Sequence, residues 1–143
     1  KVFVGNKGEY IIIKAPGLQS QAILKGPVMV IPLGDDLYKV GASYGRDDYS
    51  TSTTPEACEE ISVKLSKMIS CDFSVVDQVT GIRPTVKDRK PLVGCLQNLK
   101  SVSFLNGLGT RGLTMAPGLA GHLYDYLENN VQIPELMDIK RFV

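Results

Sequence analysis

Short apolar runs separated by turn residues constrain the fold of this chain more than any other feature of its sequence. Residues 28–31 and 37–42 flank the turn-forming segment Gly34-Asp35-Asp36, a pattern that predicts an antiparallel hairpin. The β-branched run at residues 10–13 predicts a further strand. Two more strands are predicted at residues 73–82, closed by Gly81-Ile82-Arg83-Pro84, and at residues 101–106.

Two segments carry the spacing of amphipathic helices. Thr54 and Pro55 supply an N-cap and a first-turn proline, after which apolar residues recur at helical spacing. These residues are Ala57, Ile61, Leu65, Met68 and Ile69. A second helix is predicted from about residue 116 to 128, with Pro117 near its first position. Antiparallel strands followed by a strand, a turn and a helix predict an α+β fold in two parts, residues 1–82 and 83–143.

Composition argues against several classes of function. The 143 residues are 43% hydrophobic and hold 16 Lys+Arg against 15 Asp+Glu, which gives a net charge of +1. This balance argues against a nucleic acid or a membrane surface as an electrostatic partner. No apolar stretch approaches the roughly 20 residues that span a bilayer.

The cysteines and the start of the chain bear on its cellular compartment. Cys58, Cys71 and Cys95 form no CxxC pair, which favours reduced thiols in a cytoplasmic protein and argues against a zinc site of that type. Lys1 follows no methionine and no signal-peptide pattern. We therefore expect a cytoplasmic protein, of which this chain is a piece.

A glycine-rich segment lies between the last predicted strand and the last predicted helix. Residues 107–112 fit G-x-G-x-x-G, but a dinucleotide-binding unit needs a second strand ending in an acidic residue about 20 positions on. Only 15 residues follow Glu128, and they include Pro134, which argues against such a unit. A glycine turn beside a helix N-terminus still predicts N–H groups able to receive an anion. A turn whose glycines merely permit positive φ is the alternative.

Two arginines are candidates for carboxylate recognition. Arg83 precedes a proline at the end of a predicted strand, and Arg111 lies inside the glycine turn. The planar guanidinium suits two-point binding of a carboxylate. A structural ion pair stays open as the alternative, with Asp72, Asp77 or Asp88 as the partner.

Other candidates are weaker. His122 is the single histidine and falls within the second predicted helix, which argues against a histidine-based metal site or a Ser-His triad. The aspartate pairs at residues 35–36 and 47–48 are interpreted as turn formers. Tyr38, Tyr44 and Tyr49 are interpreted as half-exposed strand residues, with the lining of a pocket as the alternative.

Two stretches form an extended motif, GIRPTVKDRKPLVG at residues 81–94 and NGLGTRGLTMAPG at residues 106–118. The motif resembles the C-terminal signature of FAD-dependent amino acid oxidases, the group of D-amino acid oxidase and glycine/sarcosine oxidase. Residues 28–32 and 37–42 resemble the hairpin of that family's substrate domain. The resemblance implies a mostly antiparallel substrate-binding sheet with a packed helix in residues 1–82. Residues 83–143 would supply the last strand, turn and helix of an FAD-binding domain whose N-terminal dinucleotide-binding part is missing.

The resemblance also implies a reaction. A small amino acid or N-methyl amino acid would pass a hydride from its α-carbon to FAD, the imine would hydrolyse, and oxygen would re-oxidise the flavin to give hydrogen peroxide. An FAD-dependent hydroxy-acid dehydrogenase of the same fold and a flavin-free binding module are the alternatives. This chain alone is expected to be inactive without the missing FAD-binding region, and a homo-oligomer is left open.

Specific residues acquire roles from the resemblance. Arg83 would clamp the substrate carboxylate, and Arg111 would lie close by. Met29 stands where glycine oxidases carry a tyrosine, so the hydroxyl that would reach the carboxylate is absent. The cofactor-binding residues, which would meet the pyrimidine edge of the flavin, are Gly109, Arg111, Gly112, Leu113, Thr114 and Met115.

Overall fold

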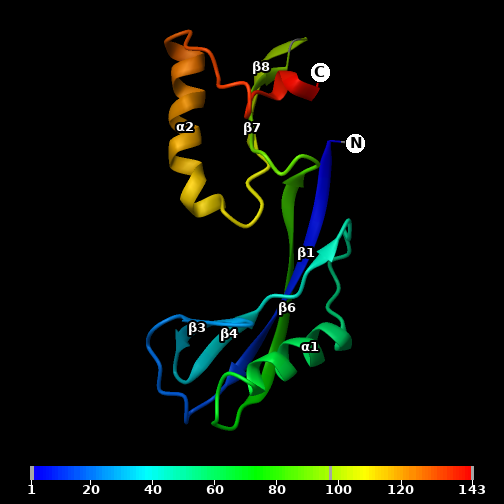
Figure 1. The fold of residues 1–143 in the computed structure, drawn as a ribbon, viewed down its shortest axis with the longest axis vertical. Helices are drawn as coiled ribbons and strands as arrows, with labels where there is room; N and C mark the ends of the chain where they lie inside the picture. Colours follow the sequence, from blue (N-terminus) through cyan, green and yellow to red (C-terminus); the bar gives the residue numbers. More distant parts are fainter. Residues whose placement is uncertain (1, 97, 143) are drawn as a thin grey trace. The chain divides into compact units, whose positions relative to one another are not determined.

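A computed structural model describes residues 2–96 and 98–142 and divides the chain into two compact units (Figure 1). Unit 1 comprises Lys1–Asn6 and Arg83–Val143, and unit 2 comprises Lys7–Ile82. Strands β1 (Phe3–Lys14) and β6 (Ser74–Val86) pair with each other, and each contributes residues to both units.

The sheet of unit 2 is built around the predicted hairpin. Its strand order is β2-β3-β4-β1-β5, and β1 also pairs with β6. The hairpin strands β3 and β4 lie side by side and antiparallel, as predicted (Figure 1). Asp35 and Asp36 connect them with φ of +52° and +60°, the signs that a tight primed hairpin turn requires. The shorter elements of this sheet are β2 (Leu24–Lys25), β3 (Met29–Gly34), β4 (Leu37–Gly41) and β5 (Gly45–Arg46).

Helix α1 (Pro55–Ser66) begins as the sequence predicts and covers one face of this sheet. The Thr54 hydroxyl accepts a hydrogen bond from the Ala57 N–H over 3.3 Å. The predicted stripe buries Ala57, Ile61 and Leu65. The helix ends before the last two residues of that stripe, because the Met68 N–H bonds the carbonyl of Leu65 in a tight closing turn.

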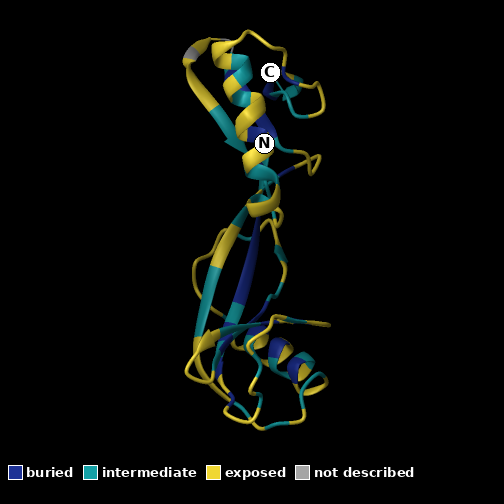
Figure 2. Cartoon of the chain, turned by 90° about the vertical axis from the view of Figure 1, so that its left-hand side faces the viewer, coloured by how far each residue is buried: buried dark blue, intermediate teal, exposed yellow. Residues whose placement is uncertain are grey.

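The core of unit 2 lies between α1 and the inner sheet face. Figure 2 shows the central part of β1 and one side of α1 as buried. The fully or nearly buried members of the core are Ile11, Ile13, Ala15, Val28, Val30, Tyr38, Val40, Ile61 and Leu65.

Strand β6 runs further than the sequence predicts. The glycine and proline at residues 81–84 were expected to close it, yet it continues to Val86. Pro84 is tolerated because a proline lacks only the N–H donor, and its carbonyl still accepts a hydrogen bond from the Gly109 N–H over 3.1 Å.

In unit 1 a two-stranded sheet precedes the second long helix. Strand β7 (Leu92–Leu96), which the sequence did not predict, pairs antiparallel with β8 (Leu99–Asn106). Helix α2 (Gly112–Glu128) begins four residues before the expected start, so Pro117 lies inside it rather than at its first position. A short 3-10 helix, η1 (Ile139–Phe142), follows. The apolar cores of this unit centre on Val86, Leu92 and Ile139 and on Val93, Leu119 and Ile133.

Residues 2–96 and 98–142 were searched for helices that could cross a membrane and for clusters that could bind a metal. Neither long helix there combines the length and the hydropathy that crossing a lipid bilayer demands. In the same residues, no three His, Cys, Asp or Glu side chains are grouped so that they could hold a metal ion.

Candidate functional site

The glycine turn at residues 107–112 joins β8 to α2 and is held against the end of β6. Gly109 donates its N–H to the carbonyl of Pro84, the residue that follows Arg83, over 3.1 Å. Gly107 and Gly109 have φ of +72° and +56°, the left-handed region that favours glycine. The two motif stretches of the sequence are therefore in direct contact within unit 1.

Glycine is required at position 107 because neighbouring atoms leave no room for a side chain, as well as because φ is positive. A Cβ atom at this position would lie 2.5 Å from Cγ2 of Val86 and 3.2 Å from the carbonyl oxygen of Lys90. Neither neighbour can withdraw without moving the backbone or the buried core. The turn therefore holds the end of β6 and the start of β7 at a fixed separation.

Substitution of Gly107 by alanine is expected to lower the free energy of unfolding by about 2 to 4 kcal/mol, because left-handed strain and overpacking add. Urea unfolding measures the change. The matched control is Gly118→Ala in α2, where an added Cβ meets nothing within 4 Å and alanine favours the helix. Equal destabilisation by the two changes would contradict the role assigned to Gly107.

The N-terminus of α2 presents backbone donors that no side chain caps. Arg111 occupies the N-cap position without a side-chain hydrogen bond, and the first turn contains no acidic residue. Leu113 is 98% exposed, and Thr114 is exposed as well. The positive end of the helix dipole therefore meets no negative side chain of its own first turn.

Arg83 directly precedes Pro84, and Arg111 follows Gly109 by two residues, so both are close in sequence to the contact between β6 and the glycine turn. Arg83 is half-buried in β6, and Arg111 is exposed at the start of α2. Asp88, one of the open ion-pair partners, is engaged by Arg141, whose Nε lies 2.8 Å from Oδ2. The hydrogen bond from Arg141 outweighs the desolvation of Asp88 and lowers the pKa of that carboxyl. Arg141 was not among the residues predicted from the sequence.

Met29 belongs to the other unit. It lies on β3 with 41% of its surface exposed, and it pairs with Gly41 of β4 and Lys25 of β2. The predicted site residues thus fall into two groups. Arg83, Arg111 and the cofactor-binding residues lie in unit 1, and Met29 lies in unit 2.

A buried polar network in unit 2 was missed by the sequence analysis. Lys7 and Glu9 of β1 form an ion pair over 3.0 Å with side chains only 4% exposed. Glu9 also accepts hydrogen bonds from the Thr54 N–H over 2.7 Å and from Nε2 of Gln78 over 2.8 Å. Lys7 donates to the Ser50 hydroxyl over 3.0 Å. This network ties β1 and β6 to the start of α1.

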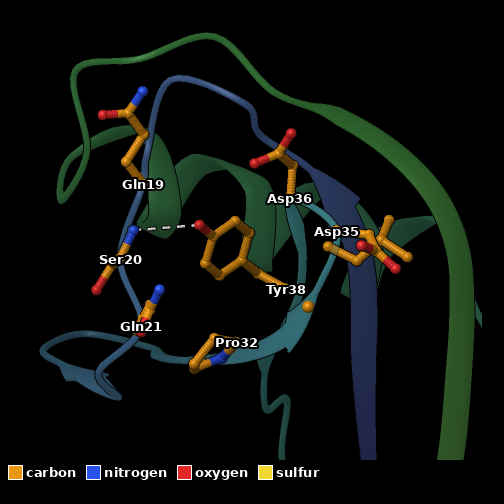
Figure 3. Close-up of a pocket in the computed structure, with 9 residues that line it drawn as sticks. Gln19, Ser20, Gln21, Pro32, Asp35, Asp36 and Tyr38 are labelled. Atoms are coloured by element: carbon orange, nitrogen blue, oxygen red, sulfur yellow. Dashed lines mark hydrogen bonds between the residues drawn. The ribbon is translucent and has the colours of Figure 1, made fainter.

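A hollow of about 430 Å³ lies beside the hairpin turn, between residues 19–21 and Tyr38 (Figure 3). The Ser20 N–H donates to the Tyr38 hydroxyl over 3.2 Å. Tyr38 is only 4% exposed, so the interpretation of it as a half-exposed residue is wrong: its ring packs into the core. None of the predicted site residues lines this hollow.

Comparison with known proteins identifies the family. Residues 2–126 match the family model described as FAD dependent oxidoreductase, so the chain belongs to that family. This finding confirms the resemblance seen in the sequence.

Solved structures show the same α+β fold. A glycine oxidase from Bacillus cereus matches with a TM-score of 0.72 at 17% identity over 90% of this chain and 36% of its own. An iminodiacetate oxidase from Chelativorans sp. BNC1 matches with 0.70 at 20% identity over 96% and 40%. An L-α-glycerophosphate oxidase from Mycoplasma pneumoniae, with FAD bound, matches with 0.71 at 18% identity over 96% and 40%. The chain therefore spans 36% to 40% of the length of these structures.

The residues at the start of α2 fit the cofactor of this family. A flavin gains negative charge at its pyrimidine edge when it is reduced, and uncapped N–H groups at a helix N-terminus favour such charge. Of the predicted cofactor-binding residues, Gly109 and Arg111 lie in the turn, and the rest lie in the first turn of the helix. They form one continuous segment in unit 1.

Proposed function

We propose that this chain is part of a flavoenzyme that oxidises a small amino acid or N-methyl amino acid by hydride transfer to FAD. Membership of the FAD-dependent oxidoreductase family supports the redox class. The observation that carries the proposal is the hydrogen bond between Gly109 and Pro84. It joins the strand that bears Arg83 to the turn that leads into the uncapped helix.

Arg83 binds the substrate carboxylate in this proposal. It is half-buried, and its backbone is held in the extended strand directly before Pro84. A planar guanidinium in that setting loses little conformational freedom when it binds two oxygens. Arg111, two residues beyond Gly109, is the second cation assigned to the substrate.

When bound, FAD supplies the acceptor for the hydride. The N–H groups of Gly112, Leu113 and Thr114 would face the pyrimidine edge and would stabilise its negative charge, an effect of roughly 1 kcal/mol in ordinary settings. The Thr114 hydroxyl would add a donor at the same edge. These residues would thereby favour the reduced state.

We assign residues 1–82 to substrate binding and residues 83–143 to completion of the FAD-binding domain. The exposed face of α2 supports the second assignment. Leu113, Pro117, Ala120, Tyr124 and Leu127 recur at spacings of four and three residues, and all are exposed. An apolar stripe of this kind is normally covered. The covering polypeptide, outside these 143 residues, would hold the ADP half of FAD.

The unpaired thiols support a cytoplasmic location. Cys58, Cys71 and Cys95 are free, which suits a reducing compartment such as the cytoplasm. Dioxygen is the electron acceptor that we assign, with hydrogen peroxide as its product.

Product analysis of the complete flavoprotein tests the proposal. With glycine or sarcosine as substrate, we expect ammonia or methylamine to form in step with hydrogen peroxide. Oxidation of glycolate or lactate without any nitrogen-containing product would instead favour a hydroxy-acid dehydrogenase, because a carboxylate clamp serves both substrate classes. A protein that binds no flavin would leave the binding module as the remaining alternative.

A further inference from the structure

The side-chain amide of Asn6 on β1 is buried with only one of its two ends hydrogen-bonded. The residue is 5% exposed. Its Nδ2 donates to the hydroxyl of Thr85 on β6 over 2.7 Å. Its Oδ1 is buried as well and has no hydrogen-bond partner among residues 2–96 and 98–142. Asn6 and Thr85 both belong to unit 1, so the contact lies within one compact unit.

The Thr85 hydroxyl connects Asn6 to the backbone of Arg83. Its oxygen lies 3.4 Å from the carbonyl oxygen of Arg83, to which it donates. Because a hydroxyl has a single proton, the Thr85 oxygen accepts from Asn6, and this sets the amide with Nδ2 toward Thr85. A chain of hydrogen bonds therefore runs from Asn6 through Thr85 to the peptide group of Arg83.

This chain lies where the backbone of β6 has one donor fewer than elsewhere. Pro84 follows Arg83 and has no N–H. The Pro84 carbonyl accepts the N–H of Gly109 in the glycine turn, and a Cβ at Gly109 would lie 3.9 Å from Oγ1 of Thr85. The Thr85 hydroxyl therefore lies at the contact between β6 and the glycine turn, next to Arg83.

The stability of the fold does not account for an amide at position 6. A buried carbonyl oxygen without a donor costs free energy, and each such group calls for an explanation. Leucine has nearly the same shape and would carry no such cost. Because Oδ1 is covered by the protein, it does not itself meet a ligand. The contribution of Asn6 is therefore the bond from Nδ2 to Thr85.

We propose that Asn6 is a positioning residue for the carboxylate clamp. Through the Thr85 hydroxyl it holds the peptide group of Arg83 in the orientation that directs the guanidinium to the substrate. This inference rests on the proposed function, which assigns the substrate carboxylate to Arg83. Arg83 and Thr85 point to the same face of β6, because side chains alternate along a strand. A misdirected guanidinium would bind one carboxylate oxygen instead of two.

Titration of the complete flavoprotein with acetate, followed by the visible flavin spectrum, measures carboxylate binding without turnover. In Thr85→Val, which removes the hydroxyl and keeps the shape, we expect acetate to bind roughly 3- to 10-fold more weakly, the effect of one neutral hydrogen bond. Thr85→Ser keeps the hydroxyl and should bind acetate as the parent protein does. The matched control is Thr80→Val, which removes a hydroxyl on the same strand that donates to the Gly8 carbonyl over 3.5 Å. It should leave acetate binding unchanged.

Asn6→Leu separates positioning from a purely structural role. We expect it to weaken acetate binding by the same factor, while the urea midpoint of unfolding stays the same or rises. The double variant Asn6→Leu, Thr85→Val should bind acetate no more weakly than either single variant, because both residues act through one chain. A lower urea midpoint with unchanged acetate affinity would overturn the assignment.

Two further results would also overturn it: unchanged acetate binding in Thr85→Val, or an equal loss in Thr80→Val. Arg83→Ala distinguishes this inference from the function on which it rests. If Arg83→Ala alone weakens acetate binding, the clamp stands and the role of Asn6 is refuted. Acetate binding that survives Arg83→Ala would refute the clamp, and the positioning role with it. If the Asn6 and Thr85 variants behave as expected but no amine reduces the flavin, amine oxidation alone is refuted.

Discussion

Replacement of Glu9 by alanine is expected to lower the free energy of unfolding by about 3 to 5 kcal/mol, the usual effect of breaking a buried ion pair from one side. The Lys7 ammonium would stay buried with its closest carboxylate removed. The Thr54 N–H and the side-chain amide of Gln78 would lose an acceptor at the same time. The loss thus reaches the start of α1 and the strand β6 together.

Urea unfolding of Glu9→Ala and of Glu60→Ala separates this burial effect from a change of charge. Glu60 forms an exposed pair with Lys64 one turn along α1, which contributes a few tenths of a kcal/mol. We expect the Glu60 change to be nearly silent. Similar effects of the two substitutions would contradict a stabilising role for the buried network.

The same carboxyl makes stability depend on pH. Burial raises the pKa of Glu9, but the hydrogen bonds from Lys7 and Thr54 and the charge of Lys7 outweigh it, so the pKa lies below its ordinary value of 4.5. The folded state therefore binds fewer protons than the unfolded state below that value, and stability should fall as the pH drops from about 4.5. Glu9→Gln should flatten this part of the profile.

Substitution of Arg83 by alanine in the complete flavoprotein is expected to weaken substrate binding by about 2 to 5 kcal/mol, because a desolvated carboxylate would lose its charged partner. Steady-state kinetics with the best amino acid substrate measure the change as a rise in KM. The matched control is Arg89→Ala, which removes an equal charge from the exposed turn after β6. An unchanged KM in Arg83→Ala would refute the clamp.

The parts of the fold that the sequence predicted depend on local chemistry. Thr54 and Pro55 mark the start of α1 because capping uses residues three positions apart, and Asp35-Asp36 marks the hairpin because its turn is self-contained. Strand β7 and the end of β6 could not be predicted in this way. Each depends on a partner, β8 for the former and the glycine turn for the latter.

The same distinction between local and long-range features separates the residues that could be predicted from those that could not. The motif at residues 81–118 was visible because its glycines and arginines are close in sequence and distinctive in order. The network of Lys7, Glu9 and Gln78 was not, since it joins strands about 70 residues apart.

The central claim is tested most directly by an anaerobic visible spectrum of the complete protein, recorded before and after addition of glycine, sarcosine and a mixture of amino acids. We predict a yellow protein whose flavin absorbance bleaches when the substrate is added. A yellow protein that stays oxidised with every amine would contradict amine oxidation. A colourless protein that takes up no added FAD would contradict the flavoenzyme account altogether.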